Sequence, residues 1–242
     1  MKRIAFLLAL SALTASAACS GPATPPADPA NRYELRPASP GGIGKFYLGR
    51  EIAEVMGHTG ADWLDRSDRV EEERTDLLIG ALPLRPTDVV VDLGAGTGFF
   101  TLPLARVVAQ GKVLAVDLQP EMLAMIRRRV GAAKLTNIET VLASEADPHL
   151  PRDSVDLVLL VDAYHEFSYP REVMQHVVAA LKPQGRVALV EYRGEDPNVP
   201  IRRLHKMTER QARLEMAAVG LRWIRTEDLL PQQHLILFEK SR

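Results

Sequence analysis

Residues 89–100, with the sequence VVVDLGAGTGFF, join a short apolar run directly to a turn that contains three glycines. The apolar run is typical of a strand that is covered on both faces of a parallel sheet. Gly94, Gly96 and Gly98 have no Cβ, which suits a chain that bends sharply and lets a ligand approach its backbone. The stretch predicts an α/β domain with a small-molecule site at the glycine turn.

The spacing of the glycines separates two kinds of nucleotide-type ligand. A dinucleotide turn has the pattern G-x-G-x-x-G, but Phe99 occupies the third glycine position here, which disfavours an NAD-dependent oxidoreductase. The pattern is instead D-x-G-x-G-x-G, and it resembles motif I of the class I S-adenosylmethionine (SAM)-dependent methyltransferases. The resemblance implies that the turn passes the methionyl part of SAM and that the following residues bind the cofactor: Asp92, Gly94, Ala95, Gly96 and Gly98.

A second strand over residues 112–116 ends in Asp117, followed by Leu118. Asp117 lies about 20 residues after the glycine turn, which is the βαβ position of a ribose-binding acid. Pro120 and Glu121 then suit the first turn of a helix. We therefore assign Asp117 and Leu118 to the cofactor site.

A third strand is expected over residues 138–142, followed by a polar loop. In the family this loop carries an acidic residue followed by a small one, next to the adenine. Either Glu145 or Asp147 fits, and we prefer Glu145 because Ala146 follows it. A merely polar loop is the alternative.

Polar residues follow the fourth and fifth strands, which we expect over residues 155–161 and 186–190. Because ligands bind outside the carboxyl ends of parallel strands, both groups should face the same edge of the sheet. The first group contains Asp162, Tyr164, His165 and Glu166, and the second contains Glu191 and Tyr192. His165 is the candidate general base, oriented or charged by Glu166 or Asp162, since a histidine titrates near neutral pH. The alternative is a structural histidine.

The alternation of strands and helices predicts one doubly wound, Rossmann-like domain over residues 83–242. Helices are expected near residues 99–109, 121–133, 170–181 and 209–219. The last two strands, over residues 221–226 and 234–239, are joined by too short a link for a crossover helix and should form an antiparallel hairpin. The resemblance to the family implies a seven-stranded sheet with six parallel strands and one antiparallel strand.

Residues 43–82 precede this domain, and in the family such a segment forms a helical lid. We expect a helix over residues 44–56 and a second over residues 68–82, with residues 71–74 in solvent. His58, Trp63 and Arg66 are then candidates for the wall of the site.

The remaining pocket candidates are Tyr164, Glu191, Tyr192 and His205. His58, His165, Glu166, Glu191, His205 and His234 together offer nitrogen and oxygen ligands for a metal. No local spacing such as H-E-x-x-H supports a metal site, so we predict none and keep the metal as the alternative.

The N-terminus predicts export. Lys2 and Arg3 precede an apolar run over residues 4–13 that is too short to span a membrane, as in a signal peptide over residues 1–18. Residues 16–19 resemble a lipobox and assign lipidation to Cys19, which implies an outer-membrane lipoprotein facing the periplasm. A cut after Ala17 would leave a soluble periplasmic protein. Residues 19–42 are rich in proline and should form an extended tether.

The chain of 242 residues has a net charge of −1, which offers no electrostatic footprint for nucleic acid. Five segments resemble a subgroup of exported or lipid-anchored methyltransferase-like proteins: residues 44–58, 60–66, 161–167, 190–197 and 204–212. The expected function is SAM-dependent methyl transfer to a small molecule or an envelope component. The alternative is an exported, non-catalytic SAM-binding protein, and nothing indicates an oligomeric state.

Overall fold

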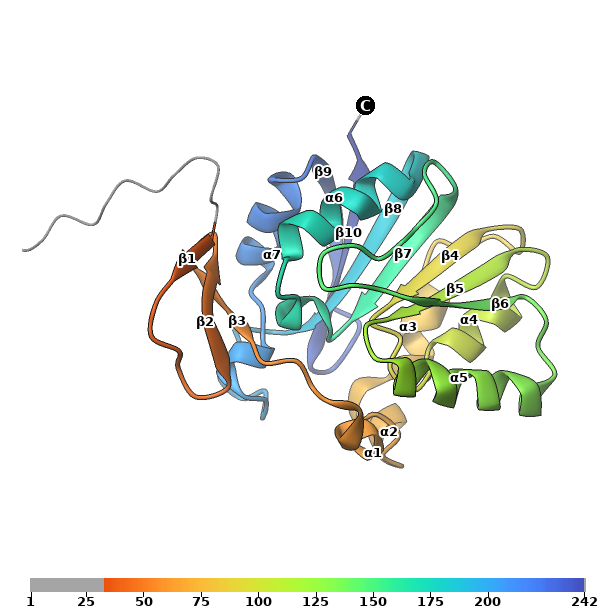
Figure 1. The fold of residues 1–242 in the computed structure, drawn as a ribbon, viewed down its shortest axis with the longest axis horizontal. Coiled ribbons are helices and arrows are strands. Elements are labelled where there is room, and N and C mark those ends of the chain that lie inside the picture. Colours follow the sequence, from red (N-terminus) through yellow and green to blue (C-terminus); the bar gives the residue numbers. More distant parts are fainter. Residues whose placement is uncertain (1–32, 242) are drawn as a thin grey trace, which may run out of the picture.

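The computed structural model describes residues 33–241, which form a small antiparallel sheet and a large mixed sheet (Figure 1). The large sheet has seven strands: β4 (Val89–Leu93), β5 (Lys112–Asp117), β6 (Ile138–Leu142), β7 (Val155–Val161), β8 (Leu181–Tyr192), β9 (Leu221–Glu227) and β10 (Gln233–Lys240). These bounds agree with the seven predicted strands, except that β8 begins earlier and ends later than expected.

The order of the strands in the large sheet is β6-β5-β4-β7-β8-β10-β9. Neighbouring strands from β6 to β8 are parallel, whereas β10 pairs antiparallel with both β8 and β9. The predicted Rossmann-like fold with one antiparallel strand is confirmed. The strand order reverses at β4 and β7, and ligands bind at such switch points in open α/β sheets.

Helices cover both faces of the sheet. α3 (Thr75–Ala81), α4 (Thr101–Val107) and α5 (Pro120–Ala133) pack on one face, whereas α6 (Pro170–Ala180) and α7 (Glu209–Ala217) pack on the other. Because side chains alternate along β4, Val90 packs in the core beneath α3 and α4, whereas Val91 packs in the core beneath α6 and α7. Burial on both faces explains why the central strands are almost continuously apolar.

The helix predicted over residues 44–56 is wrong. The structure has two strands there, β2 (Gly42–Tyr47) and β3 (Arg50–Ala53), and a third strand, β1 (Tyr33–Leu35), pairs with β2 from within the predicted tether. Leu48 and Gly49 join β2 to β3, with φ of 47° and 90°. Two consecutive residues with positive φ make the turn type that matches the twist of a β-hairpin.

The small sheet lies beside α7, at one end of the large sheet (Figure 1). Arg50 of β3 donates hydrogen bonds of 2.7 and 2.8 Å to the two carboxylate oxygens of Glu215 on α7. Both side chains are almost fully buried. The N-terminal segment is thereby fixed to the body of the domain.

The helix predicted over residues 68–82 is interrupted. α2 (Arg69–Glu73) and α3 meet at Arg74, whose φ is 51°, and η1 (His58–Gly60) and α1 (Ala61–Leu64) precede them. Glu73, expected in solvent with its neighbours, is buried. The break turns Glu73 inward, toward partners that are distant in sequence.

Several N-terminal predictions lie outside the described residues: the signal peptide, Cys19 and the first part of the tether. Within residues 33–241, no helix is both long and apolar enough to cross a membrane.

Candidate functional site

The glycine turn leaves β4 with a backbone that only glycine adopts easily. Gly94, Gly96 and Gly98 have φ of 78°, 53° and 83°. The amides of Gly94 and Ala95 both donate to the carbonyl of Val116 in the neighbouring strand. A Cβ added at Gly94 would lie 2.7 Å from the Cβ of Ala163, so a side chain there is excluded by space as well as by conformation.

Asp117 at the end of β5 holds this turn in place. Its Oδ2 accepts a 2.8 Å hydrogen bond from the Gly96 amide, and its Oδ1 accepts one of 2.9 Å from the Gln119 amide. Burial raises the pKa of Asp117 above the usual value for an aspartate. Each oxygen keeps a further lone pair, so the carboxylate can still accept hydrogen bonds from a ligand.

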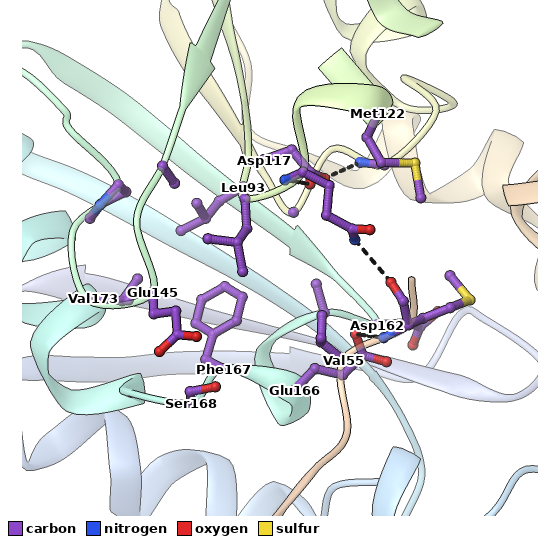
Figure 2. A pocket seen from close by; sticks show the side chains of 18 of the residues that line it. Val55, Leu93, Asp117, Met122, Glu145, Asp162, Glu166, Phe167, Ser168 and Val173 are labelled. Atoms are coloured by element: carbon purple, nitrogen blue, oxygen red, sulfur yellow. Dashed lines mark hydrogen bonds between the residues drawn. The ribbon is translucent and has the colours of Figure 1, made fainter. Parts of the chain in front are cut away.

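A cavity, here called the glycine-turn cavity, opens between the turn and the ends of β5 and β7 (Figure 2). Asp117 and Met122 lie on one side of it and Val55, Glu166 and Asp162 on another (Figure 2). Its apolar wall includes Leu93, Met122, Ala143, Phe167 and Val173. It therefore combines an apolar wall with several carboxylates, which suits a ligand that has both an apolar ring and hydroxyl groups.

The N-terminal segment covers part of this cavity. The side chain of Gln119 joins the N-terminal segment to the cavity. Its Nε2 donates to the Met56 carbonyl at 2.9 Å, and its Oε1 accepts from the His58 backbone amide at 2.6 Å. The Met56 amide donates to Oε2 of Glu166 at 3.0 Å. Val55, Met56 and Leu64 thus form a cover that is fixed by hydrogen bonds to the domain beneath.

A second cavity adjoins the first and is called the histidine cavity here. The two share Val55, Met56, Leu64, Asp162 and Glu166 in their linings. The histidine cavity is further lined by residues from the N-terminal segment, from the turn after β7, from β8 and from the loop after β8: Trp63, Arg66, Arg69, Glu73, His165, Tyr192, Arg202 and His205. A ligand in one cavity therefore meets a ligand in the other across Asp162 and Glu166.

His165 lies in η2 (Tyr164–Glu166) and is held by Glu191. Nδ1 of His165 is 2.6 Å from Oε2 of Glu191, and Nε2 is 3.0 Å from Nδ1 of His205. Burial opposes protonation, but the charge and hydrogen bond of Glu191, with Glu166 and Asp162 nearby, raise the pKa of His165 above its ordinary value. The imidazole is fixed in orientation between Glu191 and His205, and His165 and His205 both line the histidine cavity.

Asp162 stands at the junction of the cavities in a strained conformation, with φ of 49°. Its Oδ2 accepts from the Gln233 side chain at 2.9 Å, while Oδ1 is buried without a hydrogen-bond partner. Burial, followed by the charges of Glu73 and Glu191, raises the pKa of Asp162 well above its usual value. Its unpartnered oxygen and its positive φ make Asp162 a candidate for contact with a ligand.

Glu73 is a site residue that the sequence did not indicate. It accepts hydrogen bonds from Arg66 at 2.6 Å, Arg69 at 3.0 Å and Tyr192 at 2.9 Å. Burial opposes ionisation, yet the two arginines keep the pKa of Glu73 below its ordinary value. Gln119 and Gln233 were missed as well, since an isolated glutamine carries no pattern.

The structure places the predicted residues in three groups. Those that line the glycine-turn cavity are Gly94, Gly96, Asp117, Leu118, Glu145, Asp162 and Glu166. Those that line the histidine cavity are Trp63, Arg66, Asp162, His165, Glu166, Tyr192 and His205. Those that line neither cavity are Asp92, Ala95, Gly98, Ala146, His58, Tyr164 and Glu191.

The residues outside both linings have other partners. Asp92 lies beneath the turn and accepts a 2.5 Å hydrogen bond from Thr101, and burial raises its pKa to about 6. Tyr164 donates to Glu215 at 2.8 Å. Glu191 supports His165 from behind. Of the two acids considered for the loop after β6, Glu145 lines the cavity and Asp147 does not.

Comparison with known proteins finds a family similarity in the central part of the chain. Residues 90–185 match the family described as a methyltransferase domain. An uncharacterized methyltransferase-like protein of Schizosaccharomyces pombe is 32% identical over 152 residues, which cover 62% of this chain and 56% of that protein. A demethylmenaquinone methyltransferase of Symbiobacterium thermophilum is 33% identical over 109 residues, or 44% of this chain and 43% of that one. The chain spans about half the length of these curated relatives.

Solved structures share the fold. A SAM-dependent methyltransferase of Aquifex aeolicus superimposes with a TM-score of 0.72 at 23% identity, over 76% of this chain and 99% of that chain. A SAM-dependent methyltransferase of Mesorhizobium loti gives a TM-score of 0.56 at 22% identity, over 76% and 100% of the two chains.

Proposed function

We propose that the chain transfers a methyl group from SAM to an acceptor in the histidine cavity, because residues 90–185 match a methyltransferase domain and the fold is that of solved SAM-dependent methyltransferases. The acceptor is a small molecule or an envelope component. The observation that carries the proposal is the junction of the two cavities, which brings an acceptor site against the cofactor site.

The residues of the glycine-turn cavity fit SAM. Gly94 and Gly96 both line the cavity, and a Cβ added at either would lie 2.7 Å from a side-chain carbon, of Ala163 and of Leu64 respectively, so the turn keeps its path only with glycine there. Asp117 offers free lone pairs to the ribose hydroxyls, and the apolar wall with Met122 and Phe167 suits the adenine. SAM supplies an electrophilic methyl group on a sulfonium sulfur.

The chain's own contribution to methyl transfer is position and desolvation. Such a displacement is accelerated mainly by holding donor and acceptor near attack distance in a site that excludes water. Val55, Met56 and Leu64 cover the junction, while Asp162 and Glu166 flank it. We assign the acceptor's deprotonation to the group around His165, because His165 and His205 line the acceptor side and Glu191 stabilises a positive imidazole.

The test is methyl transfer from labelled SAM into fractionated envelope and metabolite extracts. His165→Ala should bind SAM as the wild type does and lose at least a hundredfold in turnover, which is the usual range for a general base. His176→Ala, an exposed histidine on α6, should behave as the wild type. Equal turnover of His165→Ala on the identified acceptor would remove His165 from this role.

The second candidate is a non-catalytic SAM-binding protein. It is favoured by the export signal predicted from residues 1–18, because SAM is made in the cytoplasm. Such a protein would bind SAM but label no acceptor in the same extracts.

Export and lipidation at Cys19 remain part of the proposal. Metabolic labelling with a fatty acid should mark the wild type and leave Cys19→Ala unmarked. Equal labelling of both proteins would contradict an anchor at Cys19, and export without labelling would favour the cut after Ala17.

A further inference from the structure

Three potential ligand atoms of the histidine cavity face one another. They are Nε2 of His165, Nδ1 of His205 and Oε1 of Glu166, with separations of 3.0 Å between the nitrogens, 3.4 Å from His205 to Glu166 and 3.8 Å from His165 to Glu166. A triangle with these edges has a point about 2.0 Å from every corner, which is the length of a bond from zinc to nitrogen or oxygen.

In His165 and Glu166, the nitrogen or oxygen atom that does not face this triangle already has a hydrogen-bond partner. Nδ1 of His165 is 2.6 Å from a carboxylate oxygen of Glu191, and Oε2 of Glu166 accepts from the Met56 amide at 3.0 Å. A hydrogen bond from Nδ1 to a carboxylate fixes the tautomer and leaves the Nε2 lone pair free for a metal. The side chains of His165 and Glu166 are thus already oriented when no ion is bound.

We propose that His165, His205 and Glu166 bind one Zn²⁺ ion whose remaining coordination position faces the histidine cavity. Two imidazoles and one glutamate are a ligand set of catalytic zinc sites, which keep one position open for water or substrate. All three residues line that cavity, and His205 is partly exposed, so an ion and an acceptor atom can both enter.

The proposed ion site does not depend on the proposed function, but the role of the ion in catalysis rests on that function. The acceptor's oxygen, nitrogen or sulfur binds the ion and releases its proton to water, since a bound metal lowers the pKa of such a group. Its electron pair then forms the bond to the methyl carbon, while the carbon–sulfur bond of the sulfonium breaks and its electrons remain on sulfur. With the ion bound, His165 is a ligand, and the ion activates the acceptor in its place.

The test uses the untagged full chain, stripped with a chelator and titrated with Co²⁺ or Zn²⁺ alone. We expect one ion per chain, with visible absorption of Co²⁺ typical of a four- or five-coordinate site. His205→Ala and Glu166→Gln should weaken binding at least tenfold, and Glu191→Gln should weaken it tenfold to a hundredfold, as supporting residues do. His176→Ala should bind as the wild type.

Thermal unfolding of each variant without metal separates loss of the site from loss of the fold. Binding that is absent in the wild type, or unchanged in a folded His205→Ala, overturns the proposal. Failure here leaves SAM binding intact, whereas failure of the proposed function would appear as lost SAM binding or methyl transfer with stoichiometric metal still bound.

Discussion

The amide of Gly96 donates a 2.8 Å hydrogen bond to Oδ2 of Asp117, so the ribose-side acid and the glycine turn form one unit. Gly96 lies in the turn after β4 and Asp117 is the last residue of β5, 21 positions later in the chain. Asp117 therefore shapes the backbone that the cofactor approaches, in addition to offering oxygens of its own.

Gly94→Ala should lower the free energy of unfolding by about 2 kcal/mol and weaken SAM binding, because a left-handed backbone costs an alanine about 1–2 kcal/mol. The new methyl group would also lie 2.7 Å from the Cβ of Ala163. Gly80→Ala is the control: a Cβ there meets nothing within 4 Å, and helix α3 should gain up to about 1 kcal/mol. Urea denaturation measures both, and equal stability of the two variants would contradict the strain at Gly94.

Asp92→Asn should change how stability depends on pH. Burial, with a smaller effect of Asp117, raises the pKa of Asp92 from 3.8 to about 6, although Thr101 and Arg69 oppose the shift. Between these values the folded state binds more protons than the unfolded state, so the free energy of unfolding falls as pH rises. Two pKa units correspond to about 3 kcal/mol.

The measurement is the difference in unfolding free energy between Asp92→Asn and the wild type, at pH values from 4 to 8. Groups present in both proteins largely cancel in this difference. The variant should gain up to about 3 kcal/mol relative to the wild type between about pH 4 and pH 7. A difference that is independent of pH would show that Asp92 titrates normally.

Arg50→Ala should destabilise the chain by about 3 kcal/mol or more, because it leaves the buried carboxylate of Glu215 without its cation. Lys112→Ala breaks the exposed ion pair with Glu139 and should cost no more than about 1 kcal/mol. Denaturant titrations compare the two. Similar small losses would mean that the small sheet is held to α7 by other contacts.

The large sheet could be predicted from the sequence because its strands are separated by glycine turns and amphipathic helices. The mixture of six parallel strands and one antiparallel strand followed from the family resemblance, and the glycine turn and Asp117 located the glycine-turn cavity. The signals in these segments are local and agree with one another.

The small sheet could not be predicted in the same way. The spacing of Phe46, Tyr47 and Ile52 fits both a helix and a pair of strands, and only the turn at Leu48 and Gly49 distinguishes the strands. Glu73 was assigned to solvent because its burial depends on Tyr192, 119 residues away. The approach of His205 to His165 likewise depends on how two loops fold together.

Calorimetric titration of SAM, its demethylated product and NAD into the wild type, Asp117→Ala and Glu139→Gln tests the central claim most directly. Glu139 is an exposed acid on the neighbouring strand and serves as the control. We predict that the wild type and Glu139→Gln bind SAM and its product, that Asp117→Ala loses at least tenfold in affinity for both, and that NAD does not bind. Tight binding of NAD, or unchanged SAM affinity in a folded Asp117→Ala, would contradict the assignment of this cavity to SAM.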